Sequence, residues 1–270
     1  MGKIKAKIPS YAETTIARDA RVIFFSDAHL GIEDSEESRL NSKRVAAFLD
    51  SLRGKVDVLV ILGDLFDFYF EYKSVFPARY LKVLAGIETL SSSGVSCYYV
   101  AGNHDFWLGE LFSSTLGVEL VPDSLILNRE SNPKERVLAA HGDGLGEGDI
   151  GYKILKKILR NRLLILLFRL LHPDWGYALA RITSRTSRKY TINYQPARIE
   201  AFTEVARSLL TAYEDLDTVI LAHTHQSEHR QFDQGRYLNP GNWLTHFSYI
   251  VWNAPGEYEL KNFHYPPLQE

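Results

Sequence analysis

DVLVILGDLFD, at residues 57–67, indicates the fold of this chain more clearly than any other segment. Its first half is a continuous run of aliphatic and β-branched residues, which is typical of a short strand buried on both faces. The run ends directly in Gly63 and Asp64. Because glycine adopts backbone conformations that other residues avoid, the chain can turn sharply at Gly63. The pattern predicts a buried strand whose carboxyl end presents an acidic side chain.

The same pattern, an apolar run followed by Asp, Asn or His, occurs four more times along the chain. The runs lead into SDAHLG at 26–31, GNHDF at 102–106, HGD at 141–143 and HTH at 223–225. Helical patterns fill three of the intervals, at 42–54, 77–92 and 196–213. Strands that alternate with helices predict an α/β fold, and such folds keep their sites at the carboxyl ends of the strands.

The last part of the chain has a different pattern. Residues 236–243, 246–253 and 256–263 have the composition of antiparallel strands. We expect them to form a second sheet packed on the first, which gives a sandwich covered by helices. The whole chain, 1–270, is expected to be one domain.

Seven side chains in the five blocks are suited to metal binding. They offer nitrogen and oxygen atoms and no thiolate, a set that favours Mn²⁺, Fe²⁺ or Zn²⁺ over a structural zinc ion. Seven ligands are enough for two divalent ions that share one bridging carboxylate, and such a pair can bind phosphate oxygens for in-line attack by water. The candidates are Asp27, His29, Asp64, Asn103, His141, His223 and His225.

His104, beside Asn103, is a candidate catalytic residue rather than a ligand. A histidine there can donate a proton to the leaving oxygen or stabilise charge on the phosphoryl group. Asp67 is the favoured partner to orient it, while Asp105 is equally suited to stabilise the turn. Asn103 can bind a metal and also donate its amide to a phosphate. For the other four histidines a place on the surface or in the core is favoured; these are His172, His229, His246 and His264.

Composition sets the broad class. The only cysteine is Cys97, so no intrachain disulfide can form, which fits a reducing compartment. Neither a secretory signal nor a membrane-spanning run is visible, and we expect a cytoplasmic protein. The net charge of −2 hides an asymmetry, because residues 151–190 contain ten basic residues and one acid. A basic segment on an acidic body indicates an anionic partner.

The segment 150–190 interrupts the strand–block–helix pattern and is expected to be a helical insertion beside the candidate site. A helix over 152–171 would carry leucine and isoleucine on adjoining stripes, and 172–178 would form a turn to a second helix. One interpretation is an ordinary amphipathic helix packed on the body. The favoured one is engagement of lipid or of an anionic membrane surface. Nucleic acid is not expected, because stacking aromatics are not interleaved with the basic residues.

The series DAH, GDLFD, GNHD, HGD and HTH resembles the calcineurin-like metallophosphoesterase superfamily over roughly residues 20–230. The resemblance implies a four-layer α-β-β-α sandwich with a helical lid insertion. It also assigns the ligands: Asp27, His29, Asp64 and His225 would hold one ion, and Asp64, Asn103, His141 and His223 the other.

A narrower resemblance is to the UDP-2,3-diacylglucosamine hydrolases of lipid A biosynthesis. GDLFDFYFEY (63–72) and HGDGLGEGDIGYK (141–153) are similar to that family's blocks, and the insertion stands where the family builds a lid for acyl chains. The similarity places Asn103, His104, Asp149 and Tyr152 at substrate-contact positions, with Arg188 and Lys189 as further candidates for phosphate contact. His104 departs from the family, in which well-known members carry Arg.

This narrower resemblance implies an activity and a location. The expected reaction is Mn²⁺-dependent cleavage of the pyrophosphate of UDP-2,3-diacylglucosamine to UMP and 2,3-diacylglucosamine 1-phosphate, at the inner face of the cytoplasmic membrane. The alternative is a metallophosphoesterase for another nucleotide or phospholipid. A nuclease is less favoured, because the basic segment is dominated by leucine and isoleucine rather than stacking aromatics. A non-catalytic scaffold is less favoured, because none of the seven ligands is missing.

Overall fold

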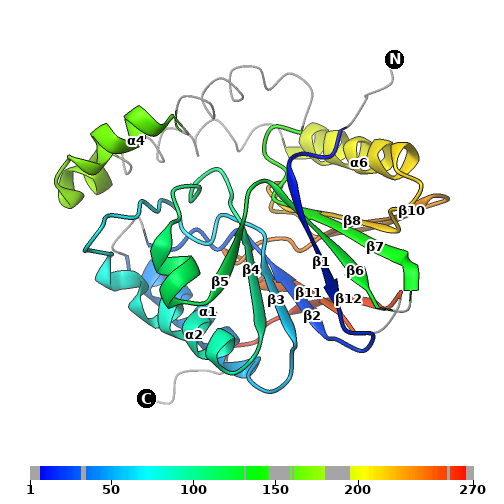
Figure 1. The fold of residues 1–270 in the computed structure, drawn as a ribbon, viewed down its shortest axis with the longest axis horizontal. Coiled ribbons are helices and arrows are strands. Elements are labelled where there is room, and N and C mark those ends of the chain that lie inside the picture. The colour runs from blue at the N-terminus through cyan, green and yellow to red at the C-terminus, as the bar shows by residue number, and fades with distance from the viewer. Residues whose placement is uncertain are drawn as a thin grey trace.

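Two six-stranded sheets face each other in the computed structural model (Figure 1). The structure describes residues 7–31, 35–130, 132–145, 159, 161–179, 195–253 and 256–265. One sheet has the strand order β12-β11-β2-β3-β4-β5, and the other has the order β1-β6-β7-β8-β10-β9.

The first sheet is built around the strand formed by residues 58–61. Its four parallel strands are β2 (Val22–Phe25), β3 (Val58–Ile61), β4 (Ser96–Val100) and β5 (Val118–Val121). The antiparallel β11 (Ser248–Trp252) and β12 (Tyr258–Asn262) extend it beside β2. Helices α1 (Glu36–Ser51) and α2 (Leu81–Ser92) cover its outer face, with a 3₁₀ turn, η1 (Ala78–Tyr80), before α2 and a short π-helix, η2 (Leu111–Thr115), before β5.

The second sheet carries the remaining strands. These are β1 (Tyr11–Ile16), β6 (Ser124–Arg129), β7 (Asn132–Ala140), β8 (Thr218–Leu221), β9 (Glu228–Phe232) and β10 (Gly235–Asn239). Helix α6 (Gln195–Ala212) covers its outer face. Apolar side chains of both sheets fill the space between them, among them Val60, Leu127 and Ile220. The order of layers is helix, sheet, sheet, helix, so the expected α/β sandwich is confirmed.

The expectation that the tail strands form a second sheet of their own is wrong. β10 pairs with β8 in one sheet, whereas β11 and β12 extend the other sheet from β2. An alternating pattern predicts a strand, but it carries no information about which free sheet edge that strand will extend.

The insertion differs from its expected form in two places. Asn161 has an extended backbone, and its side chain accepts hydrogen bonds from the amides of Leu163 and Leu164, so it caps α4 (Arg162–Arg169). One continuous helix over 152–171 is therefore wrong, because a new helix begins after Asn161. The predicted turn at 172–178 is also wrong, since residues 173–179 are helical.

Aromatic rings join the insertion to the body. Phe168 of α4 packs against Phe70 at 4.6 Å and Trp107 at 5.1 Å between ring centroids, and Tyr177 contacts Phe68 at 5.4 Å. The rest of the α4 surface is unusually apolar and exposed, and Leu170 is 77% accessible. Within the described residues, no helix is long and apolar enough to cross a membrane.

Candidate dimetal site

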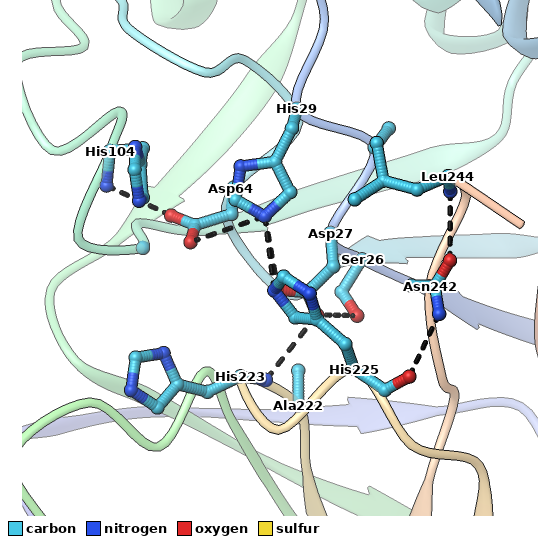
Figure 2. A network of polar contacts seen from close by, with 12 residues as sticks. Ser26, Asp27, His29, Asp64, His104, Ala222, His223, His225, Asn242 and Leu244 are labelled. Atoms are coloured by element: carbon cyan, nitrogen blue, oxygen red, sulfur yellow. Dashed lines mark hydrogen bonds and ion pairs between the residues drawn. The ribbon is translucent and has the colours of Figure 1, made fainter. Parts of the chain in front are cut away.

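The five blocks meet at one rim of the sandwich, where strands of both sheets end. Asp27 follows β2, Asp64 follows β3 and Asn103 follows β4, while His141 directly follows β7. His223 and His225 come after β8 in the other sheet. The structure brings together all seven predicted ligands, although they span about two hundred residues of sequence. Figure 2 shows the loops of Asp27, Asp64 and His225 turned toward one another.

The backbone at this rim is strained. Among the described residues, six that are not glycine have a positive φ, and five of these are candidate ligands. They are Asp27 (53°), His29 (43°), Asp64 (50°), His223 (67°) and His225 (59°). A left-handed conformation costs a residue with a Cβ roughly 1–2 kcal/mol, and such strain gathers at functional sites. The fold thus holds these side chains in place at a cost in stability.

Two glycines let the ligand loops approach each other closely. A Cβ on Gly63 would lie 2.5 Å from the amide nitrogen of Gly102. A Cβ on Gly102 would lie 2.1 Å from Oδ1 of Asp64. Only glycine fits at these two positions, because the Gly102 backbone fills the space beside Gly63 and the Asp64 carboxylate fills the space beside Gly102.

One group of possible ligand atoms lies around Asp27. Nε2 of His225 is 3.1 Å from Oδ1 of Asp27 and 3.1 Å from Nε2 of His29. Asp27 itself is fully buried, and Ser26 donates its hydroxyl to the other carboxylate oxygen at 2.7 Å. Within the described residues, Oδ1 of Asp27 is buried and accepts no hydrogen bond of good geometry.

A second group lies around Asp64. Nε2 of His141 is 3.3 Å from Oδ2 of Asp64, 3.0 Å from Nδ1 of His223 and 3.2 Å from Oδ1 of Asn103. The other nitrogen of His141 donates to the carbonyl oxygen of Leu62 at 2.8 Å. That bond leaves Nε2 facing the group, so Nε2 is the nitrogen that would bind an ion once the ring is neutral.

The donor set fits a pair of divalent ions. Ring nitrogens that face one another at hydrogen-bond distance can share only a proton or a cation between their lone pairs. A buried carboxylate oxygen without a hydrogen bond, such as Oδ1 of Asp27, is stabilised by a nearby positive charge. Asp64 lies between the two groups, because its Oδ2 is also 3.9 Å from Nε2 of His29. These side chains supply two clusters that could each hold an ion, with Asp64 able to serve both.

Charge coupling shifts the titration of these groups. Burial lowers the pKa of His29, but contacts with Asp27 and Asp67 outweigh burial and raise that pKa to about 10. Burial also lowers the pKa of His141, and the charge of Asp64 raises it to about 10. For Asp27, burial raises the pKa, yet His225 and His29 hold it well below its usual range. The carboxylates at this rim thus favour a positive charge on the rings of His29 and His141.

His104 stands at the edge of both groups. Its Nδ1 donates to the main-chain oxygen of Asp67 at 2.8 Å, while the Asp67 carboxylate is 3.7 Å away. Its main-chain amide donates to Oδ1 of Asp64 at 2.9 Å. The main-chain oxygen of Asp67 is therefore closer to the His104 ring than its carboxylate is. His104 also lies within ligand distance of His29 and Asp64.

Asp105 makes the contacts of a structural residue. It is fully buried and accepts hydrogen bonds from the amides of Gly102, Asp64 and Phe66 and from the hydroxyl of Tyr99. Burial and the charge of Asp64 raise its pKa. Of the two roles considered for Asp105, the contacts match turn stabilisation.

Sequence patterns missed two kinds of residue at the site. Arg198, in the first turn of α6, brings its guanidinium against Nε2 of His223. Asn239 and Asn242 support the loop of the last block from behind. None of the three belongs to a block, and their site contacts span 25, 17 and 17 residues, so no local spacing could reveal them. The predicted substrate contacts Asp149, Tyr152, Arg188 and Lys189 lie outside the described residues.

Comparison with known proteins gives consistent matches. The sequence model of calcineurin-like phosphoesterases matches residues 20–227. A relative from Porphyromonas gingivalis named UDP-2,3-diacylglucosamine hydrolase is 28% identical over 251 residues, which are 87% of this chain and 95% of the relative. Relatives of the same name from Neisseria meningitidis and Edwardsiella ictaluri are 30% and 29% identical, and cover 84% and 87% of this chain and 92% and 89% of their own lengths.

Proposed function

Because this chain belongs to the calcineurin-like phosphoesterase family and is a metal-dependent phosphoester hydrolase, we propose that its substrate is UDP-2,3-diacylglucosamine. The products would be UMP and 2,3-diacylglucosamine 1-phosphate. The observation that carries the choice of substrate is the apolar insertion joined to the catalytic rim by aromatic rings. The names of the relatives support the same choice.

Two divalent cations would complete the site, most simply Mn²⁺, with Fe²⁺ or Zn²⁺ as alternatives. Asp27, His29 and His225 would hold one ion, His141, His223 and Asn103 the other, and Asp64 would contribute to both. When bound, the pair supplies activation of water and neutralisation of phosphate charge.

The chain's own residues then orient the substrate and handle its charge. Water attacks the phosphorus on the uridine side, and the bond to the oxygen of the sugar phosphate breaks. Nδ1 of His104 is committed to the Asp67 carbonyl oxygen, so Nε2 is the nitrogen that can donate to the phosphoryl group. The Asp67 carboxylate lies 3.7 Å from the same Nδ1. The amide of Asn103 can donate to the same phosphate.

We propose that the acyl chains bind along the aromatic rings that join the insertion to the body. Phe68 follows Asp67 directly, and Trp107 lies three residues after His104, so an apolar wall begins next to the polar rim. Phe168 and Tyr177 of the insertion complete this wall. A substrate with a nucleotide at one end and fatty acyl chains at the other matches a polar rim that lies next to an apolar wall. Asp149, Tyr152, Arg188 and Lys189 remain candidates for further substrate contacts.

The outer face of α4 suits a membrane surface. Its leucines are exposed, and Arg162 and Arg169 stand at its two ends. Apolar side chains with flanking arginines bind at the interface of an anionic bilayer. We therefore propose that the enzyme acts at the inner face of the cytoplasmic membrane.

A turnover assay tests the substrate. The protein is given UDP-2,3-diacylglucosamine with Mn²⁺ in detergent, and a simple aryl phosphodiester serves as comparison. Formation of UMP at a rate well above cleavage of the diester is expected. Cleavage of the diester alone would refute the glycolipid assignment and favour the alternative, a phosphoesterase for another nucleotide or phospholipid, which is consistent with the general superfamily histidine at position 104.

A further inference from the structure

Asn242, in the loop that follows β10, carries an inference beyond the chemistry of the ligands themselves. We infer that Asn242 is a positioning residue. Its side-chain amide holds the backbone of His225 in a left-handed conformation and so aims that imidazole at Asp27 before any cation arrives. The inference rests on the proposed metal-dependent function, because it concerns how one ion position is preorganised.

The hydrogen bonds of Asn242 fix its orientation. Its Oδ1 accepts from the main-chain amides of Leu244 and Thr245, each at 2.9 Å, which leaves Nδ2 to face the carbonyl oxygen of His225 at 2.8 Å. The side chain is 5% exposed, so water does not readily replace this donor. Figure 2 shows Asn242 between Leu244 and His225, on the side of His225 away from Asp64.

Asn239 supports the other end of the same block. Its Nδ2 donates to the carbonyl oxygen of Ala222 at 3.1 Å and to the hydroxyl of Thr224 at 3.0 Å, while its Oδ1 accepts from Gly241 at 2.8 Å. In addition, the amide of Trp243 donates to the carbonyl oxygen of Asp27 at 3.0 Å. The loop 239–243 therefore contacts the backbone of both loops that supply the first ion position.

This support has an energetic reason. His225 has a φ of 59°, which an imidazole-bearing residue adopts only when its surroundings compensate. Without the amide of Asn242, the partly buried carbonyl of His225 would lose this donor, and the residue could relax toward the right-handed region. Its Nε2 would then leave its place 3.1 Å from Oδ1 of Asp27. Loss of a partner behind a metal ligand typically weakens metal binding about 10–100-fold.

The test is Asn242→Asp in the full chain. Aspartate keeps the two accepting contacts and nearly the same shape, but it replaces the amide donor with an oxygen that cannot donate. Mn²⁺ binding to chelator-stripped protein is measured by calorimetry, and coupling within the Mn²⁺ pair by electron paramagnetic resonance. We expect one position to weaken about 10–100-fold, the other to stay unchanged, and the spin-coupled signal to be replaced by that of an isolated ion.

Asn262→Asp is the matched control. Asn262 also donates its side-chain amide to the main-chain oxygen of a histidine, His246, at 3.0 Å, but Asn262 is exposed and that histidine is not a candidate ligand. Its removal should leave both Mn²⁺ affinities unchanged. A second check combines Asn242→Asp with His225→Ala; because Asn242 acts through His225, the double variant should bind Mn²⁺ as the His225→Ala variant does.

Three results would overturn the inference. They are unchanged Mn²⁺ affinity at both positions in Asn242→Asp, equal weakening at both positions in step with a lower melting temperature in chelator, and a wild-type protein that binds no Mn²⁺ pair. A wild-type protein that binds two Mn²⁺ ions but does not cleave UDP-2,3-diacylglucosamine would refute the proposed substrate alone, because the Asn242 test measures metal affinity.

Discussion

His104 is the residue whose surroundings bear most directly on the chemistry. One ring nitrogen is tied to the Asp67 backbone, and the ring stands edge-on to His29 with centroids 4.9 Å apart. We expect His104→Ala to lower kcat about 10²–10⁴-fold, the usual contribution of a positioned acid or base. Metal content, measured by elemental mass spectrometry, should remain two ions per chain.

The control for His104 is His229→Ala, at an exposed position on β9. It should change neither turnover nor metal content. Unchanged turnover in His104→Ala would refute the proposed catalytic role, and loss of metal from that variant would make His104 a ligand instead.

The chemistry of individual residues was the part of the site most accessible from sequence. Each of the seven candidate ligands follows an apolar run, and the end of a buried strand fixes where such a side chain must lie. Arg198 and Asn242 could not be found in this way. Their importance depends on contacts with His223 and with the backbone of His225, which only the folded chain creates.

At the scale of elements, the ends of β3 and β4 are joined by the contact of Gly63 with Gly102. We expect Gly102→Ala to push the Asp64 loop away, since the new Cβ would lie 2.6 Å from the Asp64 amide nitrogen. Overpacking of this kind typically costs about 1–3 kcal/mol of the free energy of unfolding. Mn²⁺ affinity should fall as well, because Asp64 serves both ion positions.

Gly94→Ala separates backbone strain from this steric effect. Gly94 has a φ of 96°, and a Cβ there would meet nothing within 4 Å. Denaturant unfolding should show a loss of roughly 1 kcal/mol, with Mn²⁺ affinity unchanged. If Gly102→Ala bound Mn²⁺ as tightly as the wild type does, the proposed role of the close glycine contact would be wrong.

Helix α4 gives the prediction for membrane contact. Leu163, Leu166 and Leu170 are 63%, 55% and 77% exposed and recur at the spacing of one helical face. Replacing all three with glutamate should abolish co-sedimentation with anionic phosphatidylglycerol vesicles, because the face would lose apolar area and gain repulsive charge. Leu260→Glu, on the edge strand β12, should bind vesicles normally. Equal binding by both variants would refute contact through α4.

Elements were predictable from sequence where a local pattern determines them. The buried strands before the blocks and the helices between them follow from apolar periodicity. The pairing of β10 with β8, and of β11 with β2, depends on which sheet edges remain open after the body folds. The break at Asn161 was missed because its capping role outweighs the apolar pattern that runs through it.

At the scale of the whole molecule, the two sheets bring acidic and histidine side chains together at one rim. The raised pKa values of His29 and His141, about 10, mean that both rings are protonated at neutral pH in the metal-free protein. A ligand nitrogen must be deprotonated, so binding of the metal pair should release about two protons near pH 7.5. Calorimetry in buffers of different ionisation enthalpy measures this number.

The sign of the pH dependence follows from the same shifts. Because the folded-state pKa of each histidine lies above its unfolded value, their contribution to the stability of the metal-free fold is complete below about pH 6.5 and is lost as the pH rises through about 10. Mn²⁺ affinity should move in the opposite direction and increase between pH 6.5 and 9. Affinity that is independent of pH, with no proton release, would contradict the assignment of these rings as ligands.

Hydrolysis in water labelled with ¹⁸O tests which phosphorus of the substrate is attacked. The Mn²⁺-loaded protein is incubated with UDP-2,3-diacylglucosamine, and the products are identified by mass spectrometry. Attack on the uridine-side phosphorus predicts one ¹⁸O atom in the phosphate of UMP and none in 2,3-diacylglucosamine 1-phosphate. Label in the sugar phosphate would contradict attack on the uridine-side phosphorus. The absence of UMP would contradict the proposed substrate.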